Sequence, residues 1–232
     1  MKILAMDTSN KTLSVALVQG NELAASYQLN IKKNHSITLM PAVDRLMKEV
    51  GWCPAQLDKI IVSDGPGSYT GVRMAVTTSK TLSFTLKKPL IAVSSLALLA
   101  QNAYGFDGMI VPLFDARRGN VYAGVYQFSE GIVQEVLEDA YFSFSKLLFK
   151  LPKDKDLLFL GEDVQNFQSE IESNLPRGCI CKNSFWNLPK AENLVLIGRN
   201  KSPVANIHTF VPRYLKRVEA EEKWLKKSGS KI

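Results

Sequence analysis

A short pattern of apolar runs occurs twice in this chain, and it restricts the possible fold more than any other feature. Asp7 ends an apolar run near the N-terminus, and a second apolar run returns at 13–18 after a polar turn. Asp115 ends a similar run in the middle of the chain, and its returning run is 121–128. The two halves align from these aspartates onward without a gap. Apolar runs joined by short polar turns predict antiparallel strands. The chain is therefore expected to form two related lobes.

Helical patterns follow each set of strands. The first half predicts strands at 3–6, 13–18, 22–29 and 59–63, helices at 36–50 and 71–87, a short strand after Pro89 and a helix from about Ser94. The second half predicts helices at 145–151, 162–174 and 191–199, with strands at 157–160 and around Ile180. A duplicated order of strands and then helices is typical of the actin/sugar-kinase-like α/β fold. We expect lobes at 1–104 and 105–232, the second with a basic C-terminal tail.

Composition excludes several classes of protein. No run approaches the ~20 apolar residues that cross a bilayer, and no signal-peptide pattern opens the chain. Three cysteines, Cys53, Cys179 and Cys181, are an odd number without zinc-site spacing, which predicts free thiols in a reducing cytoplasm. We therefore expect a cytoplasmic protein without membrane association. The net charge is +7, and the segment from Arg213 to the end contains seven basic and three acidic residues. This segment could be a nucleic-acid contact or a solvated tail.

The segment at 63–73 is unusually rich in glycine and reads SDGPGSYTGVR. It lies between a predicted strand and a predicted helix, so Ser68 or Thr70 can cap the helix, and the backbone N–H groups there suit an anion. The segment lacks the lysine of a P-loop, and Thr70 takes the place of the third glycine in a dinucleotide fingerprint. The weak candidates for a nucleotide or anion contact are Gly65, Gly67, Ser68 and Gly71, together with Asp7 and Asp115. Either aspartate can instead cap its own turn through an Asx hydrogen bond.

The sequence also argues against several catalytic sites. It contains only two histidines, His35 and His208, so a His-x-x-x-His metal pair is impossible. It has no G-x-S-x-G nucleophile elbow. We expect no catalytic residue and no metal or other cofactor bound by the chain itself.

Several separated segments resemble one known family. The string GPGSYTGVR at 65–73 resembles the Gly-Pro-Gly-Ser-Phe/Tyr-Thr-Gly-Leu/Val-Arg signature of the TsaB (YeaZ) family. Further resemblances are MKILAMDTSN at 1–10, His35-Ser36 with Leu39 and Pro41, PLIAVSSLALLA at 89–100, and PRYLK at 212–216 followed by Glu219-Ala220-Glu221 and Trp224. The resemblance is dense over roughly 1–130 and 210–224 and thin between them.

The resemblance implies an actin-like fold and the role of a non-catalytic subunit. Such a subunit acts with the catalytic subunit TsaD and the ATPase TsaE to place threonylcarbamoyl on N6 of adenosine 37 in tRNAs that read codons beginning with A. It would meet tRNA through the complex and could form a homodimer when alone. TsaD carries a metal-binding His-x-x-x-His, and laying that motif on 93–99 puts its histidines at Ser95 and Leu99. The alternative function is a stand-alone ATPase or phosphotransferase of the same fold.

The family resemblance also implies an interface on the first two helices. The helix at 36–50 has an apolar arc with adaptable methionines, and the helix at 71–87 is rich in serine and threonine, which permit close helix approach. The expected partner or dimer contacts are His35, Leu39, Met40, Val43, Leu46, Met47, Met74, Thr78 and Leu82. Packing within the lobe is the alternative explanation of the same pattern.

Overall fold

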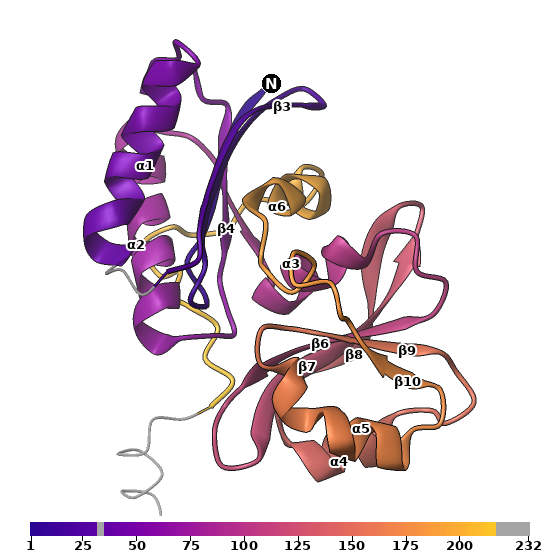
Figure 1. Ribbon diagram of the computed structural model, residues 1–232. Helices are drawn as coiled ribbons and strands as arrows, with labels where there is room; N and C mark the ends of the chain where they lie inside the picture. Colours follow the sequence, from indigo (N-terminus) through magenta and orange to yellow (C-terminus); the bar gives the residue numbers. More distant parts are fainter. Residues whose placement is uncertain (32–34, 217–232) are drawn as a thin grey trace, which may run out of the picture.

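The first sheet is built by adding two parallel strands to an antiparallel meander (Figure 1). The computed structural model describes residues 1–31 and 35–216. The strands of this sheet are β1 (Lys2–Asp7), β2 (Leu13–Gln19), β3 (Glu22–Leu29), β4 (Lys59–Ser63) and β5 (Leu90–Val93). Their order is β3-β2-β1-β4-β5, and Ala5 of β1 pairs with Ala16 of β2 and Ile61 of β4.

Helices cover both faces of this sheet because the residues of β1 alternate between two apolar cores. Leu4 and Met6 face a core shared with α1 (His35–Glu49) and α2 (Tyr69–Leu86). Ile3 and Ala5 face a core shared with α3 (Ser95–Ala100) and α6 (Ala191–Gly198). In Figure 1, α1 and α2 lie on the outer side of the first sheet, and α3 and α6 lie between the two sheets.

The second sheet repeats the topology of the first. Its strands are β6 (Met109–Asp115), β7 (Asn120–Ser129), β8 (Ile132–Ser143), β9 (Leu157–Leu160) and β10 (Gly178–Ile180). Their order is β10-β9-β6-β7-β8, so the meander and the two parallel strands occupy the same relative places. The shorter elements are α4 (Phe144–Lys150), α5 (Gln168–Asn174) and the 3₁₀ turns η1 (Pro54–Gln56), η2 (Gln101–Ala103) and η3 (Val164–Phe167). The predicted duplicated actin/sugar-kinase-like fold is therefore confirmed.

Residues 191–216 lie with the first sheet, although residues 105–232 are expected to form the second lobe. The reason is apolar packing: α6 buries Leu194 and Ile197 in the core that it shares with the first sheet. We call residues 200–216 the return segment, because they follow α6 along the first lobe. Its backbone bonds to that lobe, with Val204 N–H donating to Leu90 O at 2.9 Å. The basic tail after Lys216 lies outside the described residues.

The glycine-rich segment is packed against the turn that follows β1. Thr8 Oγ1 donates to Gly71 O at 2.7 Å, and Ser68 N donates to Ser9 O at 2.7 Å. A Cβ atom on Gly71 would lie 2.0 Å from Thr8 O, and one on Gly67 would lie 2.2 Å from Ser9 O. These glycines therefore allow two backbone segments of the first lobe to touch each other.

We expect Gly71→Ala to lower the free energy of unfolding by about 3 kcal/mol, because the added methyl group meets a backbone oxygen that cannot move alone. Gly20→Ala is the control, since Gly20 has φ +62° but no atom within 4 Å of the place that its added methyl group would take. Left-handed strain alone should cost about 1 kcal/mol there. Urea denaturation of both variants measures the difference, and equal losses would contradict the close-contact explanation.

Candidate functional site

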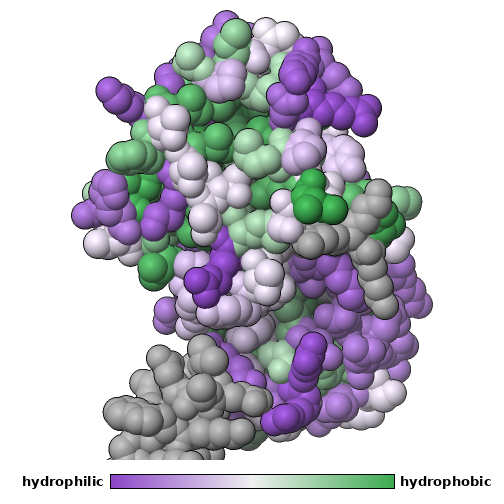
Figure 2. All heavy atoms as spheres, turned by 90° about the vertical axis from the view of Figure 1, so that its left-hand side faces the viewer, coloured by the Kyte–Doolittle hydropathy of each residue, from purple (hydrophilic) through white to green (hydrophobic). Residues whose placement is uncertain are grey.

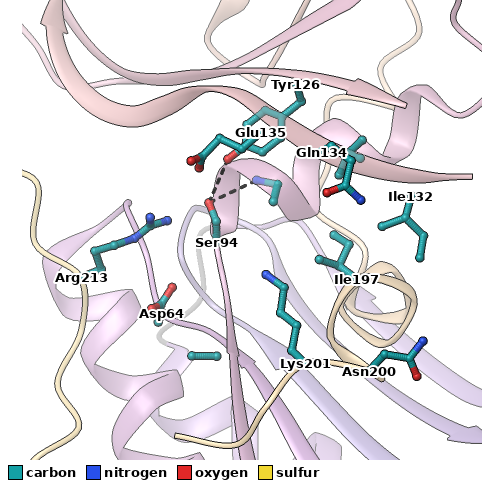
Figure 3. Close-up of a pocket in the computed structure, with 13 residues that line it drawn as sticks. Asp64, Ser94, Tyr126, Ile132, Gln134, Glu135, Ile197, Asn200, Lys201 and Arg213 are labelled. Carbon is teal, nitrogen blue, oxygen red and sulfur yellow. Dashed lines mark hydrogen bonds between the residues drawn. The ribbon is translucent and has the colours of Figure 1, made fainter. Parts of the chain in front are cut away.

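A pocket of about 530 Å³ lies between the two lobes (Figure 3). Asp64 and Ser94 reach it from just beyond the carboxyl ends of β4 and β5, the edge of a sheet at which α/β proteins bind ligands. The second lobe contributes Tyr126 of β7 and the first residues of β8. The complete lining is Asp64, Ala92, Ser94, Ala97, Tyr126, Ile132, Val133, Gln134, Glu135, Ile197, Asn200, Lys201 and Arg213.

An ion pair between a buried aspartate and a half-buried arginine closes one end of this pocket. Asp139 of β8 has no exposed side-chain surface, and its Oδ2 lies 2.5 Å from Nη2 of Arg213 in the return segment. Ser94 Oγ donates to the same oxygen at 2.5 Å, and the Tyr126 hydroxyl donates to Oδ1. The same Nη2 of Arg213 also donates to Gly65 O at 3.2 Å. The carboxylate thus receives donors from the second lobe, from the start of α3 and from the return segment.

The strand around Asp139 is shaped for this carboxylate. Ala123 pairs with Ala140 and Val125 with Leu137, so the ladder between β7 and β8 is irregular at this point. Bulges of this kind re-aim side chains near functional sites. Gly124 lies opposite, and a Cβ atom there would be 2.4 Å from Asp139 Oδ1. The site depends on glycine at position 124, because a larger residue would occupy the place of the carboxylate.

Burial also changes the acid–base properties of the pocket. It raises the pKa of Asp64 to about 6, although the charges of Arg213 and Lys201 act in the opposite direction. Burial raises the pKa of Glu135 as well. The pKa of Tyr126 is raised far above its usual range, first by burial and then by the charge of Asp139, so its hydroxyl remains a donor. Asp64 and Glu135 are therefore harder to ionise than exposed carboxyl groups.

The two aspartates predicted from the repeated pattern do not line this pocket. Ser9 N donates to Asp7 Oδ1 at 3.2 Å, and Arg117 N donates to Asp115 Oδ1 at 2.7 Å. Each aspartate therefore caps its own turn through an Asx bond, which is the structural alternative that the sequence leaves open. Asp7 also accepts a hydrogen bond from Ser63.

The predicted anion contacts in the glycine-rich segment face other parts of the chain. Backbone oxygens of Arg213, Ser9 and Thr8 approach Gly65, Gly67 and Gly71 from the side on which a Cβ would lie. Ser68 caps α2 by accepting from Gly71 N at 3.4 Å. These approaching groups are carbonyl oxygens, which repel phosphate rather than bind it.

Most of the residues expected at an interface on α1 are in the core. Leu39, Val43, Leu46 and Met47 are at most 5% exposed and pack against the first sheet. This corrects their predicted role as surface contacts: an apolar arc on a helix covers the nearest apolar face, which here is the sheet of the same lobe. His35 is the first residue of α1, and its side chain is outside the described part of the structure.

The outward side of α1 and α2 has a different set of apolar residues. Met40 is 43% exposed and Ile37 is 72% exposed, while Met74, Thr78 and Leu82 are partly exposed. Figure 2 shows hydrophobic side chains gathered on this side of the first lobe, with hydrophilic ones near its edges. We call this the α1–α2 face and define it by Ile37, Met40, Met74, Thr78 and Leu82.

The sequence does not predict the inter-lobe ion pair. Arg213 stands out in it only through the family resemblance, and Asp139 lies in the region where that resemblance is thin. One signal is present: Asp139 is an acidic residue that directly precedes Ala140, Tyr141 and Phe142. It could indicate a buried charge in a strand, but not the partner of that charge.

Comparison with known proteins identifies the family. Residues 23–224 match the family described as TsaD, tRNA N6-adenosine threonylcarbamoyltransferase. The tRNA threonylcarbamoyladenosine biosynthesis protein TsaB of Bacillus subtilis (strain 168) is 44% identical over 226 residues, which cover 97% of this chain and 98% of that protein. The chain belongs to the TsaB family.

Two further relatives show how far the likeness extends. The structure of YeaZ from Pseudomonas aeruginosa matches this TsaB-family chain with a TM-score of 0.76 at 29% identity, covering 92% of this chain and 99% of that one. A tRNA N6-adenosine threonylcarbamoyltransferase of Anaeromyxobacter sp. (strain Fw109-5) is 30% identical over 135 residues, or 48% of this chain and 40% of that protein. Likeness to the TsaB relative thus spans both lobes, whereas likeness to that transferase spans about half of the chain.

The described residues contain neither a metal-binding cluster nor a membrane-spanning helix. Residues 1–31 and 35–216 have no group of three His, Cys, Asp or Glu side chains arranged to hold a metal ion. Within the same residues, no helix has both the length and the apolar character needed to span a membrane.

We expect Arg213→Met to lower the free energy of unfolding by about 3 kcal/mol, because it leaves a buried carboxylate without its cation. This value is at the lower end of the usual range, since the Arg213 side chain is 33% exposed. Adding Asp139→Asn to Arg213→Met should recover part of the loss. Chemical denaturation of the two single variants and the double variant measures the coupling, and strictly additive losses would show that the pair does not act as a unit.

We expect the effect of Asp64→Asn on stability to depend on pH. Burial raises the pKa of Asp64 from 3.8 to about 6. A carboxyl with a raised folded-state pKa stabilises the fold when protonated, so its contribution is complete below about pH 4 and is lost as the pH rises through about 6. Relative to the wild type, Asp64→Asn should therefore gain up to about 3 kcal/mol between pH 4 and pH 8. Urea unfolding across this range tests it.

Asp107→Asn is the matched control, because Asp107 is exposed. The control should show a nearly constant difference from the wild type across the same pH range. A constant difference for Asp64→Asn as well would contradict the raised pKa.

Proposed function

We propose that this chain is the non-catalytic subunit in the biosynthesis of threonylcarbamoyladenosine in tRNA. In this proposal it acts in the cytoplasm with a TsaD-like catalytic subunit and a TsaE-like ATPase, which together place threonylcarbamoyl on N6 of adenosine 37. The observation that carries the proposal is the 44% identity to a TsaB over nearly the full length of both proteins. The chain would meet tRNA only as part of the assembly.

The residues of α3 support a role without metal chemistry. The positions that match the metal-binding histidines of TsaD are Ser95 and Leu99, and both are fully buried. A leucine cannot ligate a metal, and neither position faces solvent. Catalysis is therefore assigned to the partner, and this chain is proposed to bind no metal of its own.

The packing of carbonyl oxygens around the glycine turn likewise argues against a nucleotide phosphate at that turn.

The α1–α2 face is proposed as the surface that meets the catalytic subunit or, in its absence, a second copy of the chain. Ile37 and Met40 are exposed and Met74 and Leu82 are partly exposed, although the helices beneath are well packed. Clusters of exposed apolar residues often mark protein interfaces. Met40 is the best probe, because it is exposed on α1 beside the buried Leu39. A charge at position 40 changes the surface, whereas a charge at position 39 would unfold the lobe.

We expect Met40→Glu to weaken the complex with the TsaD-like subunit from the same source by at least about tenfold, while the variant remains folded. The reason is the cost of burying an unpaired carboxylate in an interface. Light scattering coupled to size-exclusion chromatography measures the complex, and circular dichroism measures folding. Phe149→Glu is the matched control, since Phe149 is 92% exposed on α4 of the second lobe. An undiminished complex with Met40→Glu would remove the α1–α2 face from the proposal.

Activity distinguishes the subunit from a stand-alone enzyme. The transferase assay should give full modification of tRNA only when this chain is added to the TsaD-like and TsaE-like proteins. Full modification without it would contradict the proposed role. Micromolar binding of magnesium-ATP to the isolated chain in calorimetry would instead favour the ATPase or phosphotransferase alternative.

A further inference from the structure

A second stripe of side chains runs along α2, apart from the residues of the α1–α2 face. It contains Tyr69, Arg73, Lys80 and Phe84, and the helical period places all four on one side of α2. Tyr69 is 51% exposed and Phe84 is 61% exposed, and the Arg73 side chain is exposed as well. The stripe extends for about 22 Å along the helix, at 1.5 Å per residue.

The return segment runs beside this stripe in the opposite direction (Figure 1). Tyr214 stacks on Tyr69 with ring centroids 5.2 Å apart, and His208 meets Phe84 edge to face at 5.3 Å. Between these pairs, Lys80 Nζ donates to two backbone oxygens of the segment at 2.6 and 3.2 Å. We call this surface the basic α2 face and define it by Tyr69, Arg73, Lys80, Phe84, His208 and Tyr214.

The basic α2 face is built from segments that have cations but no acids. Residues 69–88 and 200–216 contain neither aspartate nor glutamate. Within the described residues, the polar contacts of Arg73 and Lys80 are with a tyrosine hydroxyl and with backbone oxygens, and no carboxylate pairs with either. The arginine and the lysine of α1 instead pair with acids of the same helix at 2.8 and 2.7 Å. The two cations of the basic α2 face are therefore available to an anionic partner.

A hollow of about 290 Å³ opens between α2 and the return segment. Val76, Val211 and Pro212 form part of its lining, and the stacked rings of the two tyrosines also border it. Arg73 and Lys80 bring positive charge to the same hollow. A flat aromatic group can pack against such rings, and an anion attached to that group would reach the cations.

Unpaired RNA combines these two features in one molecule. Its phosphates carry the negative charge, and its bases stack on aromatic side chains with little dependence on sequence. In a duplex the bases are already stacked on one another, so the exposed rings would have no base to contact. An acidic peptide would meet the cations but would leave the places beside the rings unfilled.

We infer that the basic α2 face binds single-stranded RNA. One unpaired base packs in the hollow beside Tyr69 and Tyr214, and phosphates pair with Arg73 and Lys80. For the identity of the RNA the inference rests on the proposed function: the RNA is the tRNA loop that contains adenosine 37, bound while the chain is part of the assembly. The α1–α2 face lies on a different side of α2, so a protein partner and the RNA can be bound together.

The direct test is the fluorescence anisotropy of a labelled RNA hairpin with this loop, titrated with the complex of this chain and the TsaD-like subunit. Tyr69→Ala should weaken binding by at least about fivefold, because one base loses its stacking partner. Arg73→Gln should weaken binding and also lower the slope of log Kd against log salt concentration by about 0.7, the contribution of one phosphate contact in a single strand.

Arg177→Gln is the matched control, since Arg177 lies in the second lobe and pairs with Asp156 at 2.7 Å. This variant should change neither the affinity nor the salt slope. Unchanged affinity in both Tyr69→Ala and Arg73→Gln would overturn the inference.

A fully paired RNA duplex of the same length separates base stacking from attraction between charges. It should bind at least about tenfold more weakly than the hairpin, because its bases are not free to stack on the protein. Equal binding of the two RNAs would overturn the assignment to unpaired bases.

Light scattering of the same samples separates this test from that of the proposed function. If the complex forms and the two variants bind RNA like the wild type, the inference alone fails. If the wild-type chain forms no complex, the proposed function is contradicted, and the same titrations with the chain alone decide the inference. If Tyr69→Ala loses the complex but keeps its RNA affinity, the face belongs to a protein partner and the inference is overturned.

Discussion

The ion pair between the buried Asp139 and the half-buried Arg213 is the constraint on which the inter-lobe arrangement depends. A carboxylate with no exposed surface must be compensated, and here the compensation comes from parts of the chain that are far apart in sequence. Gly124 and the irregularity in β8 make room for the group, and Ser94 joins it to the start of α3. The cost of burying this charge thus ties the second lobe to the return segment and to the first lobe.

The fold could be predicted because the patterns that indicate its strands and helices lie within short segments of the sequence. Each strand of the two meanders is an apolar run with a polar turn at its end, and the repeated aspartates cap those turns. The buried face of α1 is also visible in the sequence as an apolar arc, but such an arc shows only that a helix is covered. It does not show whether a sheet of the same lobe or another protein covers it. For this reason the sequence and the family resemblance place Leu39 and Met47 at an interface, although both lie in the core.

The site could not be predicted because its residues come from parts of the chain that are far apart in the sequence. Arg213 and Asp139 are 74 positions apart, and no periodicity relates them. The glycine-rich segment is easier to notice but harder to interpret, since glycine permits close approach of any group. Here the groups that approach it are carbonyl oxygens of Thr8, Ser9 and Arg213. The composition of the segment indicates a close contact correctly, but it does not indicate what makes that contact.

The return segment connects the pocket to the exposed side of α2. Arg213 contacts the pocket, and the next residue, Tyr214, stacks on Tyr69 at the start of α2 with ring centroids 5.2 Å apart. Lys80 of α2 donates to Phe210 O at 2.6 Å, so the helix holds the segment at a second point. Because one short stretch of chain makes both sets of contacts, a change in the position of Arg213 must also strain the contacts on α2. The return segment thus fixes the position of Arg213 relative to α2.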